Sequence, residues 1–149
     1  ERPLDLDFAP DGSLLAVATE AGVHVLRLSD GVWVRSFPGY AAQFSPTGDL
    51  VVVDGGPGRR SHITVYNAEA GTLIKTWDAS GGTLALSPDG QLLAVSGLAV
   101  DLWDLNAAAP VLLNSLPNFA PYGRITFSDD GAFLILASWD GTVHIWGAP

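Results

Sequence analysis

Three histidines, His24, His62 and His144, are the side chains best suited to acid–base chemistry near neutral pH. His24 and His144 occupy the same place in two similar segments, Val-His-Val-Leu and Val-His-Ile-Trp, which favours strand packing or exposure over catalysis. His62 follows Arg59 and Arg60 in a predicted loop. A basic pair there could hold an anion or a carboxylate, but such pairs more often simply solvate a loop.

The carboxylates fall into two groups. Asp11, Asp89 and Asp130 lie in similar Gly-containing turns, where Asp side chains cap nearby backbone amides, so we expect them to serve the turns. Asp5 and Asp7 alternate along one predicted strand and could bind a cation as a pair. Calcium requires six or more oxygen ligands, so we expect solvated side chains at this pair instead.

Other catalytic signatures are missing from the sequence. It contains no cysteine, which excludes disulfides, thiolate catalysis and zinc bound by cysteine. No Gly-x-Ser-x-Gly nucleophile motif occurs. The Gly-Gly-Pro-Gly run at 55–58 lacks the lysine and the helix of a phosphate-binding loop. The sequence therefore predicts a non-catalytic protein without a metal or cofactor.

Composition limits the class of partner. The 149 residues are 48% hydrophobic and include 17 Gly and 10 Pro, which predicts a folded chain rich in strands and turns. The net charge of −9 argues against nucleic acid and anionic membrane as partners and favours basic ones. No apolar run is long enough to span a bilayer. The compartment stays open, with the cytoplasm slightly favoured.

A repeated turn organises the chain. Four glycines, spaced 36, 42 and 41 residues apart, each close a short turn that is followed at once by an apolar run. In such a turn Pro fixes the first corner and Gly adopts the left-handed conformation that closes the hairpin. The four turn segments are Phe8-Ala9-Pro10-Asp11-Gly12, Phe44-Ser45-Pro46-Thr47-Gly48, Leu86-Ser87-Pro88-Asp89-Gly90 and Phe127-Ser128-Asp129-Asp130-Gly131.

The runs around these turns predict an all-β fold. Each unit of about 40 residues reads as an antiparallel meander of four strands, and the last unit has only three. The approximate repeats within one domain, 1–149, are 1–39, 40–79, 80–120 and 121–149. A single such sheet cannot bury both of its faces, so the units must stack on one another.

These repeats resemble the WD-repeat family of β-propellers. The segment Ser138-Trp139-Asp140-Gly141-Thr142-Val143-His144-Ile145-Trp146 carries the resemblance, and the third unit contains the dipeptide Trp103-Asp104. The resemblance implies that Ser138, Asp140 and Trp146 belong to a hydrogen-bond network shared with a histidine of the preceding loop. Leu26 and Tyr66 stand where the first two units would have Trp, and the Gly-His pair of the family is missing from all four.

The resemblance also implies an incomplete ring, because family members usually have seven or eight blades. Four blades would leave apolar faces and an unpaired edge at Thr142, His144 and Trp146, and such surfaces are sites of association. We therefore expect a homodimer that closes an eight-bladed ring. The chain contains no Met and begins at Glu1, which favours the alternative that the missing blades lie elsewhere in a longer gene product.

We expect the function to be protein–protein binding or scaffolding, with a protein or peptide partner. Family members bind partners on loops at one end of the propeller, and Tyr, Trp and Arg are enriched at binding hot spots. Two alternatives remain: a propeller domain within a larger enzyme or signalling protein, and a purely architectural or engineered assembly module. The candidate partner-binding residues are Trp139, Tyr122, Phe119, Tyr40, Arg59 and Arg60.

Overall fold

A computed structural model describes residues 2–54, 61–79, 81–97, 99–117 and 124–149. These residues fold into two compact units: 2–54 with 61–78, and 79 with 81–97, 99–117 and 124–149. The described residues form fifteen strands and no helix, so no helix capable of crossing a membrane is found in this part of the chain. The predicted all-β class is confirmed.

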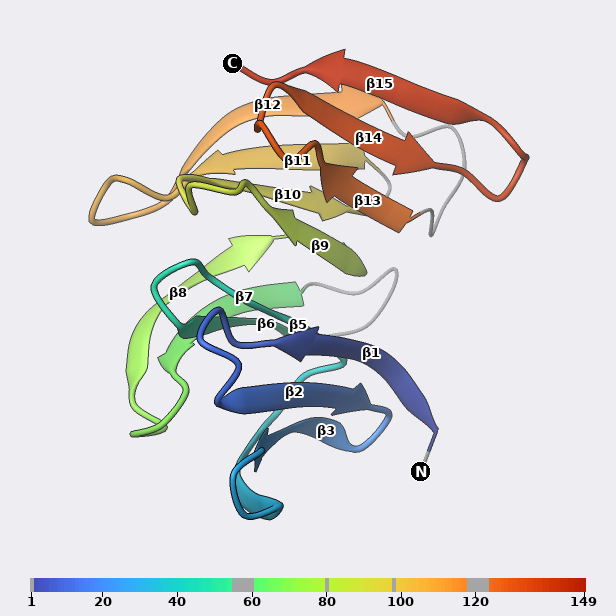
Figure 1. Cartoon of the computed structure of the whole chain (residues 1–149). Helices are drawn as coiled ribbons and strands as arrows, with labels where there is room; N and C mark the ends of the chain where they lie inside the picture. The colour runs from blue at the N-terminus through green and yellow to red at the C-terminus, as the bar shows by residue number, and fades with distance from the viewer. Residues whose placement is uncertain (1, 55–60, 80, 98, 118–123) are drawn as a thin grey trace. The chain divides into compact units, whose positions relative to one another are not determined.

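The first unit consists of two antiparallel sheets of four strands each (Figure 1). Sheet 1 has the order β1-β2-β3-β4 and sheet 2 the order β5-β6-β7-β8, so each is a simple meander. The strands of sheet 1 are β1 (Pro3–Phe8), β2 (Leu14–Thr19), β3 (Gly22–Arg27) and β4 (Val32–Phe37). Those of sheet 2 are β5 (Ala41–Phe44), β6 (Asp49–Asp54), β7 (Ser61–Asn67) and β8 (Leu73–Ala79).

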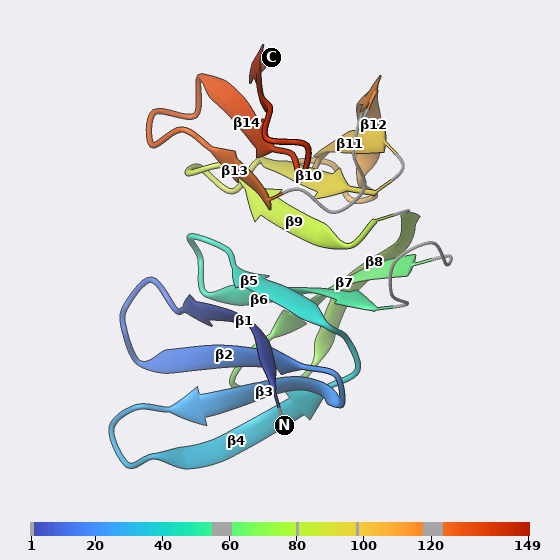
Figure 2. The same cartoon turned by 90° about the vertical axis from the view of Figure 1, so that its right-hand side faces the viewer.

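The second unit repeats this plan with one strand fewer (Figure 2). Sheet 3 has four strands, β9 (Thr83–Leu86), β10 (Leu92–Ser96), β11 (Ala99–Asp104) and β12 (Val111–Pro117). Sheet 4 has three, β13 (Arg124–Phe127), β14 (Phe133–Ala137) and β15 (Val143–Gly147). The expected three-stranded last sheet is confirmed.

The predicted turns link the first and second strands of every sheet. The amide of the turn glycine donates to the carbonyl three residues earlier, as in Gly12 to Ala9 (2.8 Å) and Gly90 to Ser87 (2.8 Å). All four glycines have positive φ, between +69° and +87°. This is the region that Gly enters without steric cost, which explains why the motif marks each hairpin in the sequence.

Each unit has its own core between its two sheets. In the first unit, Ala16 and Val25 of sheet 1 pack with Phe44 and Leu50 of sheet 2, and all four are buried. In the second, Leu102 of sheet 3 belongs to one cluster with the buried sheet 4 residues Ile125, Leu134 and Leu136, among others. Burial of alternating apolar side chains on both facing sheets stabilises this pairing.

Candidate interaction site

The exposed aromatic side chain in the β14–β15 turn is the clearest of the predicted binding residues. Trp139 is 80% exposed, which is unusual for a side chain of this size. Tyr40 is half-buried, and its amide donates to the carbonyl of Val53 (3.0 Å). These two belong to different units, so a single site that contains both stays a prediction. The candidates Phe119, Tyr122, Arg59 and Arg60 lie outside the described residues.

The turn after β14 holds the residues to which the family resemblance assigns a network. One oxygen of Asp140 accepts hydrogen bonds from the amide (2.9 Å) and the hydroxyl (2.6 Å) of Thr142, and these bonds lower the pKa of Asp140. The Thr142 hydroxyl also lies 3.0 Å from Nε2 of His144, whose ring stacks on Trp146 at 5.8 Å. The Ser138 hydroxyl is buried and has no hydrogen-bond partner among the described residues, so its family role stays a prediction.

The dipeptide Trp103-Asp104 ends β11 in sheet 3. Trp103 is paired with Leu93 on one side and with Leu112 on the other. Asp104 accepts a hydrogen bond from the amide of Asn106 (2.8 Å). In the structure this aspartate therefore helps to form the turn that follows its strand.

The repeated turn aspartates also serve the backbone, as predicted. Asp11, Asp89 and Asp130 each accept hydrogen bonds from a serine hydroxyl and from the amide two residues later. The serine hydroxyl is the largest cause that lowers the pKa of each carboxyl, followed by the amide. Low pKa values keep these groups ionised at neutral pH, where they act as hydrogen-bond acceptors.

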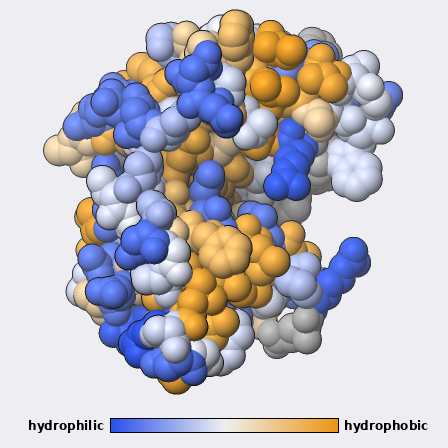
Figure 3. All heavy atoms as spheres, viewed as in Figure 1, coloured by the Kyte–Doolittle hydropathy of each residue, from blue (hydrophilic) through white to orange (hydrophobic). Residues whose placement is uncertain are grey.

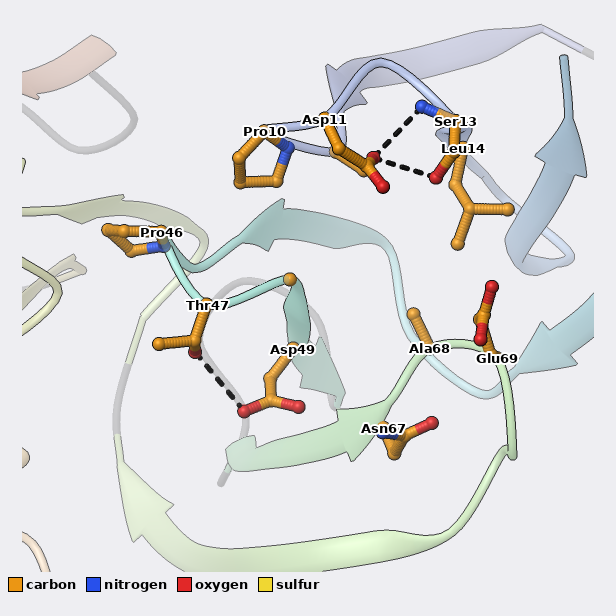
Figure 4. Close-up of a pocket in the computed structure, with 12 residues that line it drawn as sticks. Pro10, Asp11, Ser13, Leu14, Pro46, Thr47, Asp49, Asn67, Ala68 and Glu69 are labelled. Atoms are coloured by element: carbon orange, nitrogen blue, oxygen red, sulfur yellow. Dashed lines mark hydrogen bonds between the residues drawn. The ribbon is translucent and has the colours of Figure 1, made fainter.

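A cavity of about 310 Å³ lies in the first unit beside the repeated turns at residues 8–12 and 44–48 (Figure 4). Asp11, Asp49 and Glu69 contribute carboxylates to its lining. The ionised carboxyl of Asp11 suits a cationic group of a partner, in line with the preference for basic partners. Among the described residues no group of three His, Cys, Asp or Glu side chains is arranged to hold a metal ion.

Asp7 differs from the prediction of a solvated side chain. It is half-buried and accepts a 2.6 Å hydrogen bond from the amide of Phe44 in β5. Burial raises the pKa of Asp7, and the hydrogen bond from Phe44 opposes that shift only in part. Asp5 is exposed, as expected. The prediction was wrong for Asp7 because the sequence does not show that β5 packs beside β1.

The three histidines lie on third strands. Nδ1 of His24 lies 2.9 Å from the hydroxyl of Ser36 in β4, and Nδ1 of His62 lies 2.8 Å from a carboxylate oxygen of Asp78 in β8. His24 and His144 occupy equivalent positions of β3 and β15. Sequence reasoning missed these contacts to the fourth strand. It also placed His62 in a loop, whereas β7 begins at Ser61.

Sheet 1 has one open apolar face. Leu4, Leu6 and Phe8 of β1 are exposed, and Figure 3 shows hydrophobic side chains gathered over β1 and β2. Phe8 is 61% exposed, whereas Phe44, at the same position of the next repeat, is 5% exposed because sheet 1 covers it. Because the equivalent face of sheet 2 is covered by sheet 1, the exposed face of sheet 1 has the residues of a sheet–sheet contact.

Sheet 4 has an open face of the same origin. Val143 and Ile145 are exposed, and hydrophobic side chains gather over β14 and β15 (Figure 3). Ile145 is 62% exposed, whereas Leu102, its equivalent in sheet 3, is 5% exposed because it packs in the core with sheet 4. Apolar faces of this kind mark sites of protein association.

Comparison with known proteins agrees with this architecture. The family described as "WD domain, G-beta repeat" matches residues 123–147. The chain is 28% identical over 165 residues to the human U3 small nucleolar RNA-associated protein 18 homolog, covering 98% of this chain and 29% of that protein. It is 34% identical over 95 residues to a WD repeat-containing protein of Synechocystis, covering 58% of this chain and 27% of the relative. The chain thus spans less than a third of these relatives.

A solved structure shows the same fold over nearly the whole chain. A chain from the crystal structure of a mitotic checkpoint complex superposes with a TM-score of 0.87 at 18% identity, covering 99% of this chain and 49% of that chain. The four antiparallel sheets are therefore propeller blades. With this fold and with the WD-domain match in its last repeat, the chain is similar to WD-repeat proteins of the β-propeller type.

Proposed function

We propose that the chain is a non-catalytic scaffold that binds other proteins. WD-repeat propellers are typically protein-interaction scaffolds, and the observation that carries the proposal is the pair of open apolar blade faces on sheets 1 and 4. In each case the equivalent side chains of another repeat are buried against a neighbouring sheet. Removal of these faces from water by another protein surface would be favourable.

For residues 1–149 alone, we propose that a second copy covers both faces. The outer face of sheet 4 is equivalent to the sheet 3 face that packs on sheet 4, and the outer face of sheet 1 is equivalent to the sheet 2 face that packs on sheet 1. The outer face of sheet 4 in one copy could therefore pack on the outer face of sheet 1 in the other copy, as neighbouring blades pack within one chain. Two such contacts make a two-fold symmetric dimer of eight blades.

Light scattering at several concentrations tests this pairing. We expect a mass twice the 15.6 kDa of one chain, and we expect Ile145→Asp to shift it to the monomer by placing a charge in the contact. Leu73→Asp is the matched control, because Leu73 is similarly exposed but lies on β8 of sheet 2 and belongs to neither face. A folded monomer for the unaltered chain would exclude the pairing of two copies and leave the scaffold proposal standing.

The length of the relatives favours a second arrangement, in which further blades of a longer polypeptide cover the same faces. The chain spans 29% of the human relative, so the rest of that protein has ample length for more repeats. In a longer polypeptide the faces would be contacts within one ring, and the protein-binding role would pass to other surfaces. A monomeric mass for a longer product, together with burial of Phe8 and Ile145, would identify this arrangement.

The comparisons also raise the question of whether this chain binds RNA directly. The human relative carries "RNA-associated" in its name, so the comparisons give no support to the expected absence of nucleic acid. We nevertheless propose that this chain contacts proteins rather than RNA, because its net charge is −9. Affinity for phosphate backbones needs clustered Lys and Arg, and the chain has only seven in total.

A further inference from the structure

Neighbouring repeated turns touch in the second unit but leave a cavity beside them in the first. Gly131 and Gly48 have the same position in their turns. A Cβ at Gly131 would lie 3.6 Å from the ring of Pro88 in the neighbouring turn, whereas a Cβ at Gly48 would meet no described atom within 4 Å. The cavity of about 310 Å³ lies beside the turns at 8–12 and 44–48. It therefore accompanies a spacing of the turns that the second unit does not share.

The floor of this cavity is apolar. Ala9, Leu14 and Ala68 line it, and each of them is at most 6% exposed. All three belong to the core cluster between sheets 1 and 2. Pro10 and Pro46 also contribute to the lining. A group that enters the cavity therefore meets a hydrocarbon surface that the packing of the two sheets already holds in place.

The rim of the cavity is acidic, with carboxylates from three segments around the same space (Figure 4). Asp11 is in the β1–β2 turn, Asp49 begins β6, and Glu69 is in the β7–β8 turn. Asp11 and Glu69 are exposed and Asp49 is partly buried, so these groups lie above the buried floor. Lys, Arg and His are absent from the described lining. The rim thus combines three acidic side chains with no basic one.

Two of these carboxylates keep one oxygen for a further donor. The amide and the hydroxyl of Ser13 both donate to Oδ1 of Asp11 (2.9 and 2.7 Å), and Oδ2 accepts no bond from the described residues. The Thr47 hydroxyl donates to Oδ2 of Asp49 at 3.4 Å, a long distance for such a bond. The turns therefore hold both side chains in place and leave acceptor positions open.

The third carboxylate has a cationic neighbour that does not neutralise it. The side chain of Arg35 reaches the β7–β8 turn beside Gly71. Its guanidinium donates to the carbonyl of Val34 (2.8 Å), and over the described ranges it forms no ion pair with Glu69. The Glu69 carboxylate is therefore available to a cation from another molecule.

The size and the lining of the cavity fit one long basic side chain. Its volume is at the lower end of the roughly 300–1,000 Å³ that ligand pockets occupy. An apolar floor below an acidic rim complements Lys and Arg, which bury their hydrocarbon stems and keep the charge near water. The carboxylates lie on different sides of the space, so a planar guanidinium with five N–H donors can reach more than one of them. An ammonium is a compact point charge by comparison.

We propose that this cavity binds an arginine side chain of a partner protein, with its stem on the apolar floor and its guanidinium at the carboxylates of the rim. This rests on the proposed scaffold function and names the chemistry of one group of the partner. The net charge of −9 favours a basic segment as the source of that arginine. The cavity shares no residue with the open faces of sheets 1 and 4, so the binding does not depend on what covers those faces.

NMR titration of the 149-residue chain with acetyl-Gly-Arg-Gly-amide tests the site. We expect shift changes at the amides of the three rim segments. The matching citrulline peptide has the same shape without the charge, and it should bind about tenfold more weakly, because hydrogen bonds between charged groups are the stronger ones. The lysine peptide should bind about fivefold more weakly, the effect of one lost hydrogen bond. Equal binding of the citrulline or the lysine peptide would overturn the assignment to arginine.

Two protein variants locate the site. Glu69→Gln should weaken the arginine peptide about fivefold, because it removes one charge from the rim while Asn67 still holds the turn through the amide of Ala70. Glu20→Gln is the matched control, since it removes the same charge from an exposed turn of sheet 1 outside the cavity. Equal losses in the two variants would show attraction by net charge alone and would overturn the site.

Thr47→Arg tests the cavity from the opposite direction. Thr47 is exposed and lines the cavity, so the new guanidinium should occupy the rim and abolish binding of the peptide. None of these variants alters the open faces of sheets 1 and 4. Shift changes confined to other parts of the chain would therefore remove the arginine site and leave the scaffold proposal intact. Failure of the scaffold proposal would appear instead as sheet faces that bind no protein while the arginine peptide still binds.

Discussion

Two kinds of aspartate bear on how the stability of this fold depends on pH. Hydrogen bonds lower the pKa of Asp11, Asp89, Asp130 and Asp140 below the usual 3.8. Their stabilising contribution is therefore complete above that value and is lost as the pH falls through the lowered pKa. Asp7 acts in the opposite sense, because burial raises its pKa above 3.8, and ionisation there costs stability as the pH rises.

Asp7→Asn should accordingly stabilise the protein at pH 7. The amide removes the buried charge, while its oxygen can still accept the hydrogen bond from Phe44. Because Asp7 is close to half exposed, solvent screening limits the gain to between a few tenths and about 1 kcal/mol. Urea unfolding from pH 3 to pH 7 measures it, and the gain should vanish below the unfolded pKa near 3.8.

Asp129→Asn is the control for that experiment, since it removes one negative charge from an exposed turn. It should leave the stability nearly unchanged across the same pH range. A loss of stability in Asp7→Asn at pH 7 would mean that the charge on Asp7 strengthens its hydrogen bond by more than burial costs.

At the scale of elements, close approach of strands explains two glycines that are not in the repeated turns. Gly39 precedes β5 and has φ of +147°, and a Cβ there would clash with Cγ1 of Val52 and lie 2.9 Å from the carbonyl oxygen of Val53. Gly81 precedes β9 and would clash in the same way with Val95. The backbone just before the first strand therefore lies in close contact with the second strand in both sheet 2 and sheet 3.

Gly39→Ala should therefore destabilise the chain more than a substitution that meets only backbone strain. Gly31→Ala is the matched control, because Gly31 has φ of +71° and open space around it. We expect about 1–2 kcal/mol for Gly31→Ala from the left-handed backbone alone. Gly39→Ala should cost roughly 1–3 kcal/mol more from overpacking.

Chemical unfolding of the two variants side by side measures this difference. Equal losses would show that the approach of Val52 relaxes without cost, and that only the conformation of the backbone selects glycine before β5.

At the scale of the whole molecule, net charge separates two kinds of partner. With a charge of −9, residues 1–149 should bind single-stranded and duplex RNA no more tightly than roughly 10⁻⁴ M at physiological salt, the weak end of non-specific binding. Fluorescence anisotropy with labelled RNA measures this, with a basic RNA-binding domain as positive control. Tighter binding that weakens steeply with salt would contradict the prediction.

Local signals explain how much of the fold was predictable. The left-handed glycine at the end of each turn and the apolar runs around it depend on neighbouring residues only, so the sequence located fifteen strands and the short last sheet. The role of the turn aspartates was predictable for the same reason.

The candidate site was harder to predict from the sequence, because its contacts join residues that are distant in the sequence. The burial of Asp7 depends on Phe44, 37 positions away, and the pairing of His24 with Ser36 depends on a register shift between β3 and β4. A single sequence specifies neither, since both strand faces and several registers satisfy the same hydrophobic pattern.

By itself, the sequence determined the all-β class, the four repeats and the turn chemistry, because these follow from local backbone preferences and hydrophobic periodicity. Only the tertiary structure decided which apolar side chains are covered and that Asp7 is half-buried. Those outcomes depend on which sheets pack together and in what register, and packing is a property of contacts between repeats rather than of any repeat alone.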